Sequence, residues 1–443
     1  MTAKRRYRRS SVKKVSLESI KEMAILKGNS GTCVGLDIGK EEIVAVVRWA
    51  DGSFECPWSI KNPSEIPDAI QLLQMLRDVC VSLTVGLEST GTYGEAIRHA
   101  MTAAKLDVHR ISGKASSDYK EIFDGVPSQH DGKDAAIIAE LTCFGKGTSW
   151  PFAPLSEADQ EIRHQVRRLD VFREQGTQWT GRLEAQLAKH WPEVTKLLSL
   201  NSATLVRMMI HYGSPARLVA DPEAAANLGK WGRSWLTESK IEQVIESART
   251  THGLPIGGGE MAWLREIAEG LHESILQVKA CEKRLQEIAQ AHESMSKLVD
   301  SVGATTLCVI WSMVGDPGDY HSSGAFLKAM GLNLKELSSG KRQGELAITK
   351  RGPSLVRRYL YFWAMRATQQ PALKRWYEDF QKVGRSGKGT SEYRKMKGLV
   401  ALMRKLCRSL WYVHKHDEAF DYAKVFPGQS LEKRRRRRVH AST

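Results

Sequence analysis

Short runs in which apolar and polar residues alternate follow residue 31 and predict three consecutive strands. They cover residues 32–38, 42–48 and 53–58. The last two are joined by Asp51–Gly52, a dipeptide typical of a hairpin turn. Helical periodicity then alternates with short apolar runs, which predicts helices over 66–78, 93–103 and 134–143 and strands over 83–87 and 108–111. The pattern thus indicates an antiparallel meander that precedes alternating helices and strands.

This order of elements is the order of the RNase H-like fold. We therefore expect an RNase H-like, or RuvC-like, α/β domain over residues 31–150. Residues 1–30 precede it. Seven Lys or Arg and no acidic residue fall within the first fourteen positions, so this segment is expected to be a basic leader.

Residues 151–297 are charged, contain no convincing strand and predict a helical connector. Apolar residues recur at helical spacing from Ile162 to Trp191 and again from Leu264 to Ile288, which favours the two arms of a helical hairpin or coiled coil. Between the arms, residues 201–259 contain several Gly and Pro and weaker helical patterns. We expect this part to be an insertion that caps the hairpin.

A mainly α-helical domain is expected over residues 298–415, followed by a basic tail over 416–443. An apolar helix is predicted over 307–314, and further helices near 323–330 and from Pro353 and Ser391. The segment Ser301-Val-Gly-Ala-Thr305 is similar to the turn of a helix-hairpin-helix, in which helix N-terminal amides meet a phosphate. A purely structural glycine turn explains the same residues equally well.

The composition changes this picture in two ways. The chain has 443 residues with 42% hydrophobic and 26% charged side chains, which is typical of a soluble globular protein of two or three domains. The longest mainly apolar run, residues 305–314, is too short to span a bilayer, and the basic N-terminus lacks the apolar core of a signal peptide. We therefore expect a cytoplasmic protein without a membrane partner.

Seven singly scattered cysteines indicate neither a disulfide framework nor a zinc module.

Positive charge is concentrated late in the chain. The formal net charge is +16, and between Lys328 and Arg408 twenty Lys or Arg stand against five Asp or Glu. Such a basic domain suits the binding of phosphates. The basic tails are explained equally well as solubilising segments.

Four carboxylates are expected at one edge of the predicted sheet. Asp37 lies inside an apolar strand, Glu88 ends the next strand along the chain, and Asp131 and Asp134 stand three residues apart at the start of a helix. Crowded carboxylates repel one another and are tolerated mainly where a divalent metal neutralises them, and two Mg²⁺ can clamp the oxygens of a phosphodiester. The alternative is that Asp131 and Asp134 are ordinary acids at a helix start.

A Ser-Ser-Gly loop lies in the basic domain. Ser338 and Ser339 precede Gly340, and the cations that follow are candidate nucleic-acid-binding residues: Lys341, Arg342, Lys350, Arg351, Arg357 and Arg358. A serine beside glycine on an exposed loop can bring its hydroxyl to a phosphate that these cations hold. No histidine lies nearby to act as a base, which argues against a hydrolase triad. Taken alone, the tripeptide favours a plain turn over a catalytic loop.

The motifs occur in order across two domains and make the chain resemble the insertion-sequence transposases of the IS110 type, also called bridge-RNA-guided serine recombinases. The resemblance covers roughly residues 32–150 and 297–413. Its motifs are Gly35-Leu-Asp37-Ile-Gly-Lys40, Leu87-Glu88-Ser-Thr-Gly91, Asp131-Gly-Lys-Asp134-Ala135, Ser301-Val-Gly-Ala-Thr305, Gly315-Asp316, Phe326 to Leu332, Ser339-Gly340, Lys350-Arg351-Gly352 and Met403-Arg-Lys-Leu406.

The resemblance implies a function and assigns roles. The protein would excise and integrate an insertion sequence, with Ser339 attacking DNA to form a covalent phosphoserine intermediate and Ser338 as a less favoured candidate. Asp37, Glu88, Asp131 and Asp134 would bind Mg²⁺, and the serine and the carboxylates would come from different subunits. Members of the family assemble as dimers to tetramers around donor and target DNA, with a structured guide RNA that base-pairs with both.

Two alternatives remain at this point. The protein could be a RuvC-like, metal-dependent DNA nuclease that uses water as the nucleophile, in which case Ser339 is only a loop residue. It could also be a non-catalytic nucleic-acid scaffold that binds through its basic tails and basic domain. The order of the four carboxylates speaks against the scaffold, whereas the sequence alone does not separate the recombinase from the nuclease.

Overall fold

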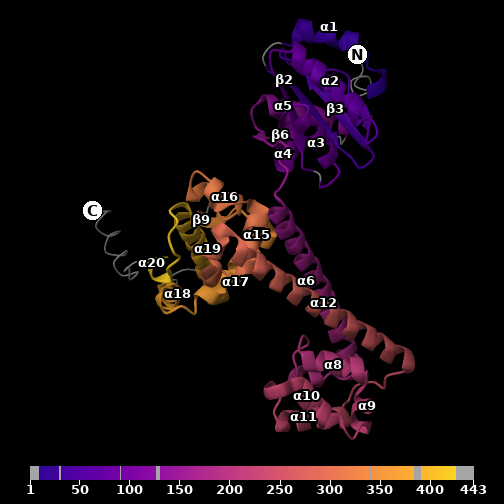
Figure 1. Cartoon of the computed structure of the whole chain (residues 1–443), viewed down its shortest axis with the longest axis vertical. Coiled ribbons are helices and arrows are strands. Elements are labelled where there is room, and N and C mark those ends of the chain that lie inside the picture. The colour runs from indigo at the N-terminus through magenta and orange to yellow at the C-terminus, as the bar shows by residue number, and fades with distance from the viewer. Residues whose placement is uncertain are drawn as a thin grey trace, which may run out of the picture. The chain divides into compact units, whose positions relative to one another are not determined.

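A computed structural model of the chain describes residues 9–28, 31–89, 91–125, 130–339, 342–383 and 391–425. The chain divides into two compact units, Met1–Pro154 and Leu155–Thr443 (Figure 1). Within the described residues, no helix has both the length and the apolarity that crossing a bilayer requires.

The first unit is built on a seven-stranded sheet with the strand order β1-β4-β3-β2-β5-β6-β7. Strands β2, β3 and β4 form an antiparallel meander, and β5 and β6 continue parallel to β2. The strands are β1 (Ser10–Ser11), β2 (Thr32–Ile38), β3 (Glu42–Arg48), β4 (Trp58–Lys61), β5 (Leu83–Glu88), β6 (Asp107–Ile111) and β7 (Thr148–Ser149). A mixed α/β domain at the start of the chain is therefore confirmed.

Helices cover both faces of this sheet. They are α1 (Leu17–Lys27), α2 (Ile66–Val79), α3 (Glu95–Ala103), α4 (Gly113–Asp124) and α5 (Asp131–Cys143), with a short 3-10 turn at Val12–Lys14. Along β3, Ile43 and Ala45 pack with α1 to α3, whereas Val44 and Val46 pack against α5. The period-2 alternation of a strand thus sends successive apolar residues into two separate cores.

Three expectations for this unit need correction. The third strand of the meander begins at Trp58 and not at Ser53, because Pro57 has no amide hydrogen to continue the ladder, and only an isolated bridge joins Phe54 to Arg48. Helix α4 was not predicted. The described part of the basic leader is also not a separate segment, because β1 pairs with β4 and Ile20 on α1 is buried in the core.

Helix α5 lies unusually close to the sheet over a pair of glycines. Gly35 on β2 and Gly86 on β5 are paired neighbours in the parallel ladder. A Cβ atom on Gly35 would lie 2.0 Å from the carbonyl oxygen of Ala135, and one on Gly86 would lie 1.9 Å from Oγ1 of Thr142. The absence of both side chains therefore lets α5 rest directly on the two strands.

The second unit contains a long antiparallel helix pair, α6 (Glu157–His190) and α12 (Gly258–Ala291) (Figure 1). Arg284 on α12 reaches Glu161 on α6 at 3.2 Å, and Arg168 donates a hydrogen bond to Gln277 at 3.1 Å. The buried positions include the apolar stripes read from the sequence, among them Leu183, Leu187, Leu264, Ile267 and Leu271. The two predicted arms of a helical hairpin are therefore present.

Short helices cover one end of this helix pair (Figure 1). They are α7 (Val194–Leu197), α8 (Ala203–His211), α9 (Pro215–Ala220), α10 (Ala224–Gly232) and α11 (Glu238–Arg249), with a 3-10 turn at Arg233–Trp235. Their apolar residues, such as Met208 and Val244, share one core with Leu187 of α6 and Leu264 of α12. Residues 201–259 thus form a helical cap on the hairpin.

A second helical core surrounds the other end of the pair. It contains α13 (Glu293–Ser296), α14 (Val299–Val302), α15 (Ala304–Val314), a 3-10 turn (Pro317–Asp319), α16 (Ser323–Ala329), α17 (Ser354–Ala367), α18 (Pro371–Val383), α19 (Ser391–Lys415) and α20 (Tyr422–Val425). Helix α15 packs among α6, α12 and α17, which explains why its sequence is apolar on nearly every side.

The segment that was expected to be a Ser-Ser-Gly loop is part of a β-hairpin. Strand β8 (Leu334–Ser339) pairs antiparallel with β9 (Arg342–Ile348), and the last pair of the ladder joins Ser339 to Arg342. The hairpin is the one strand pair described in this unit. Ser339 therefore lies on a strand, as the last residue of β8.

Candidate active site

The sheet brings Asp37 and Glu88 to the same face. Leu36 on β2 pairs with Leu87 on β5, so the next residue on each strand is a carboxylate at the end of the ladder. Both acids stand two positions beyond Gly35 and Gly86, and therefore they share the face that α5 covers. Asp37 and Glu88 are half-buried.

The N-terminus of α5 supplies the other two carboxylates. The helix begins at Asp131, and the His130 ring accepts a hydrogen bond from the amide of Gly132 at 3.1 Å. Asp131 and Asp134 lie in this first turn, where an acidic side chain also interacts favourably with the helix dipole. Asp131 is exposed and Asp134 is half-buried.

The electrostatics of Asp37 shows that the four carboxylates are close enough to interact. Its pKa is raised to about 6, first by burial and then by the negative charges of Asp134, Asp131 and Glu88. Lys120 acts in the opposite direction. Each acid in the predicted set therefore contributes to one shared field, and the structure brings together the residues that the sequence pattern had grouped.

Two cations also reach this group of carboxylates. Nζ of Lys120 on α4 lies 2.9 Å from Asp134, and the guanidinium of Arg9 contacts both Glu42 and Asp131. The sequence reasoning did not single out Arg9, Glu42 or Lys120. Lys120 lies on a helix that was not predicted, although Ala115, Tyr119 and Phe123 recur there at helical spacing. Arg9 is brought near by the pairing of β1 with β4, which no local signal indicated.

The donors fit a divalent cation in their chemistry. Four carboxylates that repel one another offer the hard oxygen ligands that Mg²⁺ and related ions prefer. Among the described residues, no three His, Cys, Asp or Glu side chains are grouped closely enough to hold a metal ion as they stand. Arg9 and Lys120 instead provide positive charge at Asp131 and Asp134, which are two of the four candidate ligands.

The predicted phosphate-binding cations of the second unit have different surroundings. Lys350 and Arg351 are exposed on a loop that the Lys350 amide joins to the carbonyl of Gly331 at 3.0 Å. Nη1 of Arg357 donates to the carbonyl of Gly352 at 2.6 Å, which fixes the end of this loop. Arg358 forms an ion pair with Asp170 at 3.1 Å. Arg357 and Arg358 therefore already have partners within the protein, a backbone carbonyl and a carboxylate respectively.

Some of the candidate residues around Ser339 are not described by the structure. Lys341 and Gly340 fall outside the described residues. The backbones of Ser338, Ser339 and Arg342 belong to the hairpin, whereas their side chains are not among the described groups. The carboxylates and Ser339 belong to different compact units of the chain.

Comparison with known families adds an independent observation. Residues 34–192 match a DEDD-type family described as transposase, and residues 297–378 match a family described as transposase IS116/IS110/IS902. The first match contains all four carboxylates, and the second contains Ser339 and the basic loop. No curated protein matches the chain.

Proposed function

The chain belongs to the IS110 family of transposases and is a DNA transposase, and from this premise we propose that it cuts and joins DNA through a covalent bond between Ser339 and a DNA phosphate. The observation that carries the proposal is the convergence of Asp37, Glu88, Asp131 and Asp134 on one face of the sheet. A RuvC-like carboxylate site and a serine in a separate basic domain are the two parts that such a reaction needs.

The proposed cleavage step is a transesterification that conserves the number of phosphate ester bonds. The hydroxyl oxygen of Ser339 attacks phosphorus, the bond from phosphorus to one deoxyribose oxygen breaks, and the DNA strand ends in a free hydroxyl. The serine proton passes to a base, and the leaving oxygen takes up one proton. In the joining step a DNA hydroxyl attacks the phosphoserine and releases Ser339 unchanged, so the reaction needs no external energy source.

Asp37, Glu88, Asp131 and Asp134 are the residues that would hold the metal, which we propose to be Mg²⁺. A bound divalent cation would supply charge stabilisation for the phosphate oxygens. The chain's own contribution is to orient these carboxylates through α5 and the paired strands. Lys350 and Arg351, which are exposed, would position the DNA backbone near the hairpin.

We extend the proposal to the assembly. Because the carboxylates and Ser339 lie in different units, the reaction requires that they be brought together, either within one chain or between subunits. The family resemblance favours exchange between subunits in a dimer or tetramer, with donor DNA, target DNA and a structured guide RNA. Mass photometry of the protein with and without its cognate RNA tests this, and a monomer in both conditions argues against subunit exchange.

The decisive experiment detects the covalent intermediate. Purified protein is mixed with Mg²⁺, cognate RNA and supercoiled plasmid, and a denaturing gel is examined for DNA attached to protein. Ser339→Ala and Asp37→Asn should both abolish the adduct. Ser338→Ala is the matched control, since it changes the neighbouring hydroxyl and should leave the adduct in place.

The other outcomes identify the alternatives. Cleavage without an adduct, retained in Ser339→Ala and lost in Asp37→Asn, would indicate a metal-dependent nuclease that uses water. Binding without cleavage in the wild type, weakened strongly by salt, would indicate a nucleic-acid scaffold. An adduct that is lost in Ser338→Ala and kept in Ser339→Ala would transfer the proposed role to the neighbouring serine.

A further inference from the structure

Two cysteines lie where the C-terminal end of α5 meets β2. Cys33 on β2 stands two positions before Gly35 and therefore shares the sheet face that α5 covers. Cys143 ends α5 and stands four positions, about one helical turn, after Ala139, which a Cβ atom on Gly35 would meet. The strand and the helix thus bring together two cysteines that are far apart in the sequence.

The sulfur atoms of both cysteines contact the same backbone oxygen. Sγ of Cys143 lies 2.9 Å from the carbonyl oxygen of Gly31, and Sγ of Cys33 lies 3.7 Å from it. The two thiols also form a hydrogen bond with each other, in which Cys33 is the donor. Both cysteines are free thiols, and their sulfur atoms are already neighbours.

The backbones approach closely enough here for a cross-link. A disulfide requires Cα atoms about 4.4–6.8 Å apart. Because Gly35 has no side chain, α5 rests on β2, and a Cβ atom on Gly35 would lie only 3.0 Å from Cα of Ala139. Cys33 and Cys143 follow this contact by one step along the strand and one turn along the helix, so their side chains have a short gap to bridge.

A cation lies beside the more accessible of the two thiols. Arg48 on β3 pairs with Cys33 in the antiparallel ladder, so its side chain leaves the sheet on the same face, and its guanidinium forms an ion pair with Glu140 on α5. The hydrogen bond from Cys33 and the positive charge of Arg48 lower the pKa of Cys143, because together they outweigh burial and a nearby negative charge. The same hydrogen bond, with burial, raises the pKa of Cys33. Cys143 is half-buried whereas Cys33 is fully buried, so Cys143 is the thiol that ionises and meets solvent more readily.

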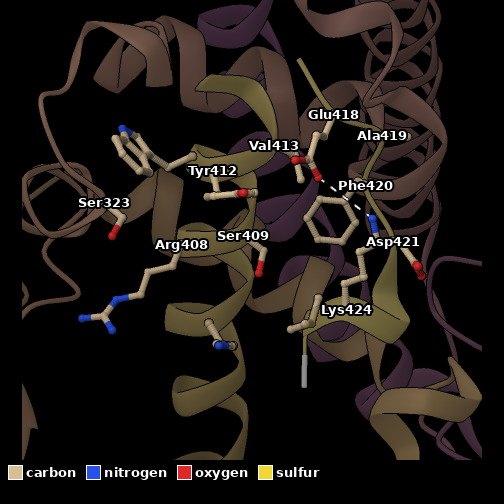
Figure 2. A pocket seen from close by; sticks show the side chains of 13 residues that line it. Ser323, Arg408, Ser409, Tyr412, Val413, Glu418, Ala419, Phe420, Asp421 and Lys424 are labelled. Atoms are coloured by element: carbon tan, nitrogen blue, oxygen red, sulfur yellow. Dashed lines mark ion pairs between the residues drawn. The ribbon is translucent and has the colours of Figure 1, made fainter. Parts of the chain in front are cut away.

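Cys407 on α19 shows the opposite environment. Its neighbour in the chain, Arg408, lines the cavity drawn in Figure 2. The sulfur of Cys407 is instead enclosed by the core, 3.7 Å from Sδ of Met330, and burial raises the pKa of this thiol. An arginine next to a cysteine in the sequence therefore does not by itself activate the thiol, whereas Cys143 combines partial exposure with a cation and a second thiol.

We propose that Cys33 and Cys143 form a reversible disulfide when the protein meets hydrogen peroxide, and that this bond fastens α5 to β2. Arg48 assists by stabilising the thiolate of Cys143. Strand β2 also carries Asp37, and the first turn of α5 carries Asp131 and Asp134, so the bond joins the two elements that hold three of the four candidate metal ligands. The inference is independent of the proposed reaction of Ser339.

The oxidation takes place in two balanced steps. In the first, the thiolate of Cys143 attacks one oxygen of the peroxide, the O–O bond breaks, and Cys143 becomes a sulfenic acid while the other oxygen takes up a proton and leaves as water. In the second, the sulfur of Cys33 attacks the sulfur of Cys143, the S–O bond breaks, and the hydroxyl group leaves as water with the proton of Cys33. Two thiols are oxidised to one disulfide, and one peroxide is reduced to two waters.

The test treats the folded, full-length protein with hydrogen peroxide and identifies the product by mass spectrometry. The intact protein should become lighter by about 2 Da, the mass of two hydrogen atoms, and digestion without reductant should yield the Cys33 peptide joined to the Cys143 peptide. Dithiothreitol should reverse both changes. The same treatment in urea should show no preference for this pair, because the contact depends on the fold. Failure to find the Cys33–Cys143 pair in the folded protein overturns the proposal.

Three serine variants test the order of the two steps. Cys33→Ser removes the second thiol, so Cys143 should continue to the sulfinic acid, a gain of about 32 Da. Cys143→Ser should leave Cys33 as a thiol under the same treatment. Cys56→Ser is the matched control, since it replaces an exposed cysteine of the same unit and should still form the cross-link. A cross-link that is lost in Cys56→Ser overturns the assignment of the pair.

An arginine variant tests the role of the cation. Arg48→Gln should slow the oxidation of Cys143 by about threefold or more, because the thiolate loses the positive charge beside it. Arg249→Gln, at an exposed ion pair on α11 of the other unit, should leave the rate unchanged. Both variants are first shown to be folded by circular dichroism. Equal rates for Arg48→Gln and the wild type overturn the role given to Arg48.

Thermal unfolding tests whether the bond fastens the helix to the strand. The cross-linked protein should unfold at a midpoint higher by roughly 10 °C, because the disulfide closes a loop of more than about 100 residues in the unfolded chain. Dithiothreitol should return the midpoint to its original value, and peroxide should not raise it in Cys33→Ser. An unchanged midpoint in fully cross-linked wild-type protein overturns this part of the proposal.

Discussion

Replacing Gly35 by alanine should push α5 away from the sheet and displace two of the four carboxylates. The new Cβ would lie 2.0 Å from the carbonyl oxygen of Ala135 and 2.4 Å from the amide nitrogen of Ala139. Both atoms belong to the backbone of α5, so no side-chain rotation removes the clash. Ordinary contact begins at 3.4 Å, and the helix must therefore retreat by about 3.4 − 2.0 = 1.4 Å.

The energetic cost follows from that displacement. Overpacking a core costs about 1–3 kcal/mol, and a clash with backbone belongs at the upper end, near 3 kcal/mol. For a domain of this size each 1 kcal/mol lowers the unfolding midpoint by roughly 2–4 °C, so we expect a loss of about 6–12 °C. A shift of about 1 Å in Asp131 and Asp134 should also lower DNA cleavage by up to about 100-fold.

The assay compares three glycines. Thermal unfolding is followed by circular dichroism for Gly35→Ala, for Gly86→Ala and for Gly181→Ala, the last of which has no neighbouring atom within 4 Å and should unfold at or above the wild-type temperature. The clash at Gly86 involves the side chain of Thr142, so the additional change Thr142→Ala should restore part of its stability. Gly35→Ala has no such side-chain rescue.

Unfolding of Gly35→Ala within about 2 °C of the wild type would refute this account, since 1 kcal/mol alone should move the midpoint by that much. Retention of full cleavage activity in a destabilised Gly35→Ala protein would refute its second part, namely that the closeness of α5 to the sheet sets the positions of the carboxylates.

Three further predictions concern charged groups. Arg9→Ala should free the carboxylates that Arg9 contacts and tighten Mn²⁺ binding about two- to fivefold, measured by electron paramagnetic resonance, and unchanged affinity would show that Arg9 does not compete with metal. Asp124→Ala should leave the fully buried Lys133 ammonium without its 2.6 Å contact and cost about 3 kcal/mol in urea unfolding; adding Lys133→Met should recover most of this loss, and no recovery would contradict the ion-pair explanation. Burial acts to raise the pKa of Asp316, but the hydrogen bonds from His414 and from the Gly318 amide, together with the charge of His414, outweigh it and lower the pKa. Asp316→Asn should therefore reduce stability above pH 3.8, and this difference should vanish as the pH falls below that value; a difference that persists in acid would contradict the linkage.

The succession of strands β2 to β6 along the chain could be predicted because it depends on local periodicity. Asp37 and Glu88 follow apolar strand residues, and parallel neighbours bring such positions to one edge. Helix α4 was overlooked although it has a short apolar stripe, since Ala115, Tyr119 and Phe123 recur every four residues and pack against the core while remaining partly exposed. Lys120 was missed with it.

Contacts that depend on the pairing of segments far apart in the sequence could not be predicted either. Arg9 reaches the carboxylates because β1 joins the sheet beside β4, a pairing of two residues on each strand that carries no periodic signal. The β8–β9 hairpin was interpreted as a loop for two reasons. Ser-Ser-Gly favours a turn, and the residues that flank it alternate between apolar and polar over only a few positions.

The α6–α12 pair is a lever arm. Each helix has 34 residues, and at about 1.5 Å per residue the arm is roughly 51 Å long. A bend of about 5° at the base would move the tip by about 4 Å, nearly the spacing of neighbouring strands. A force that acts on the α7–α11 cap therefore produces a large torque at the other end of the pair, where α15 packs against both helices.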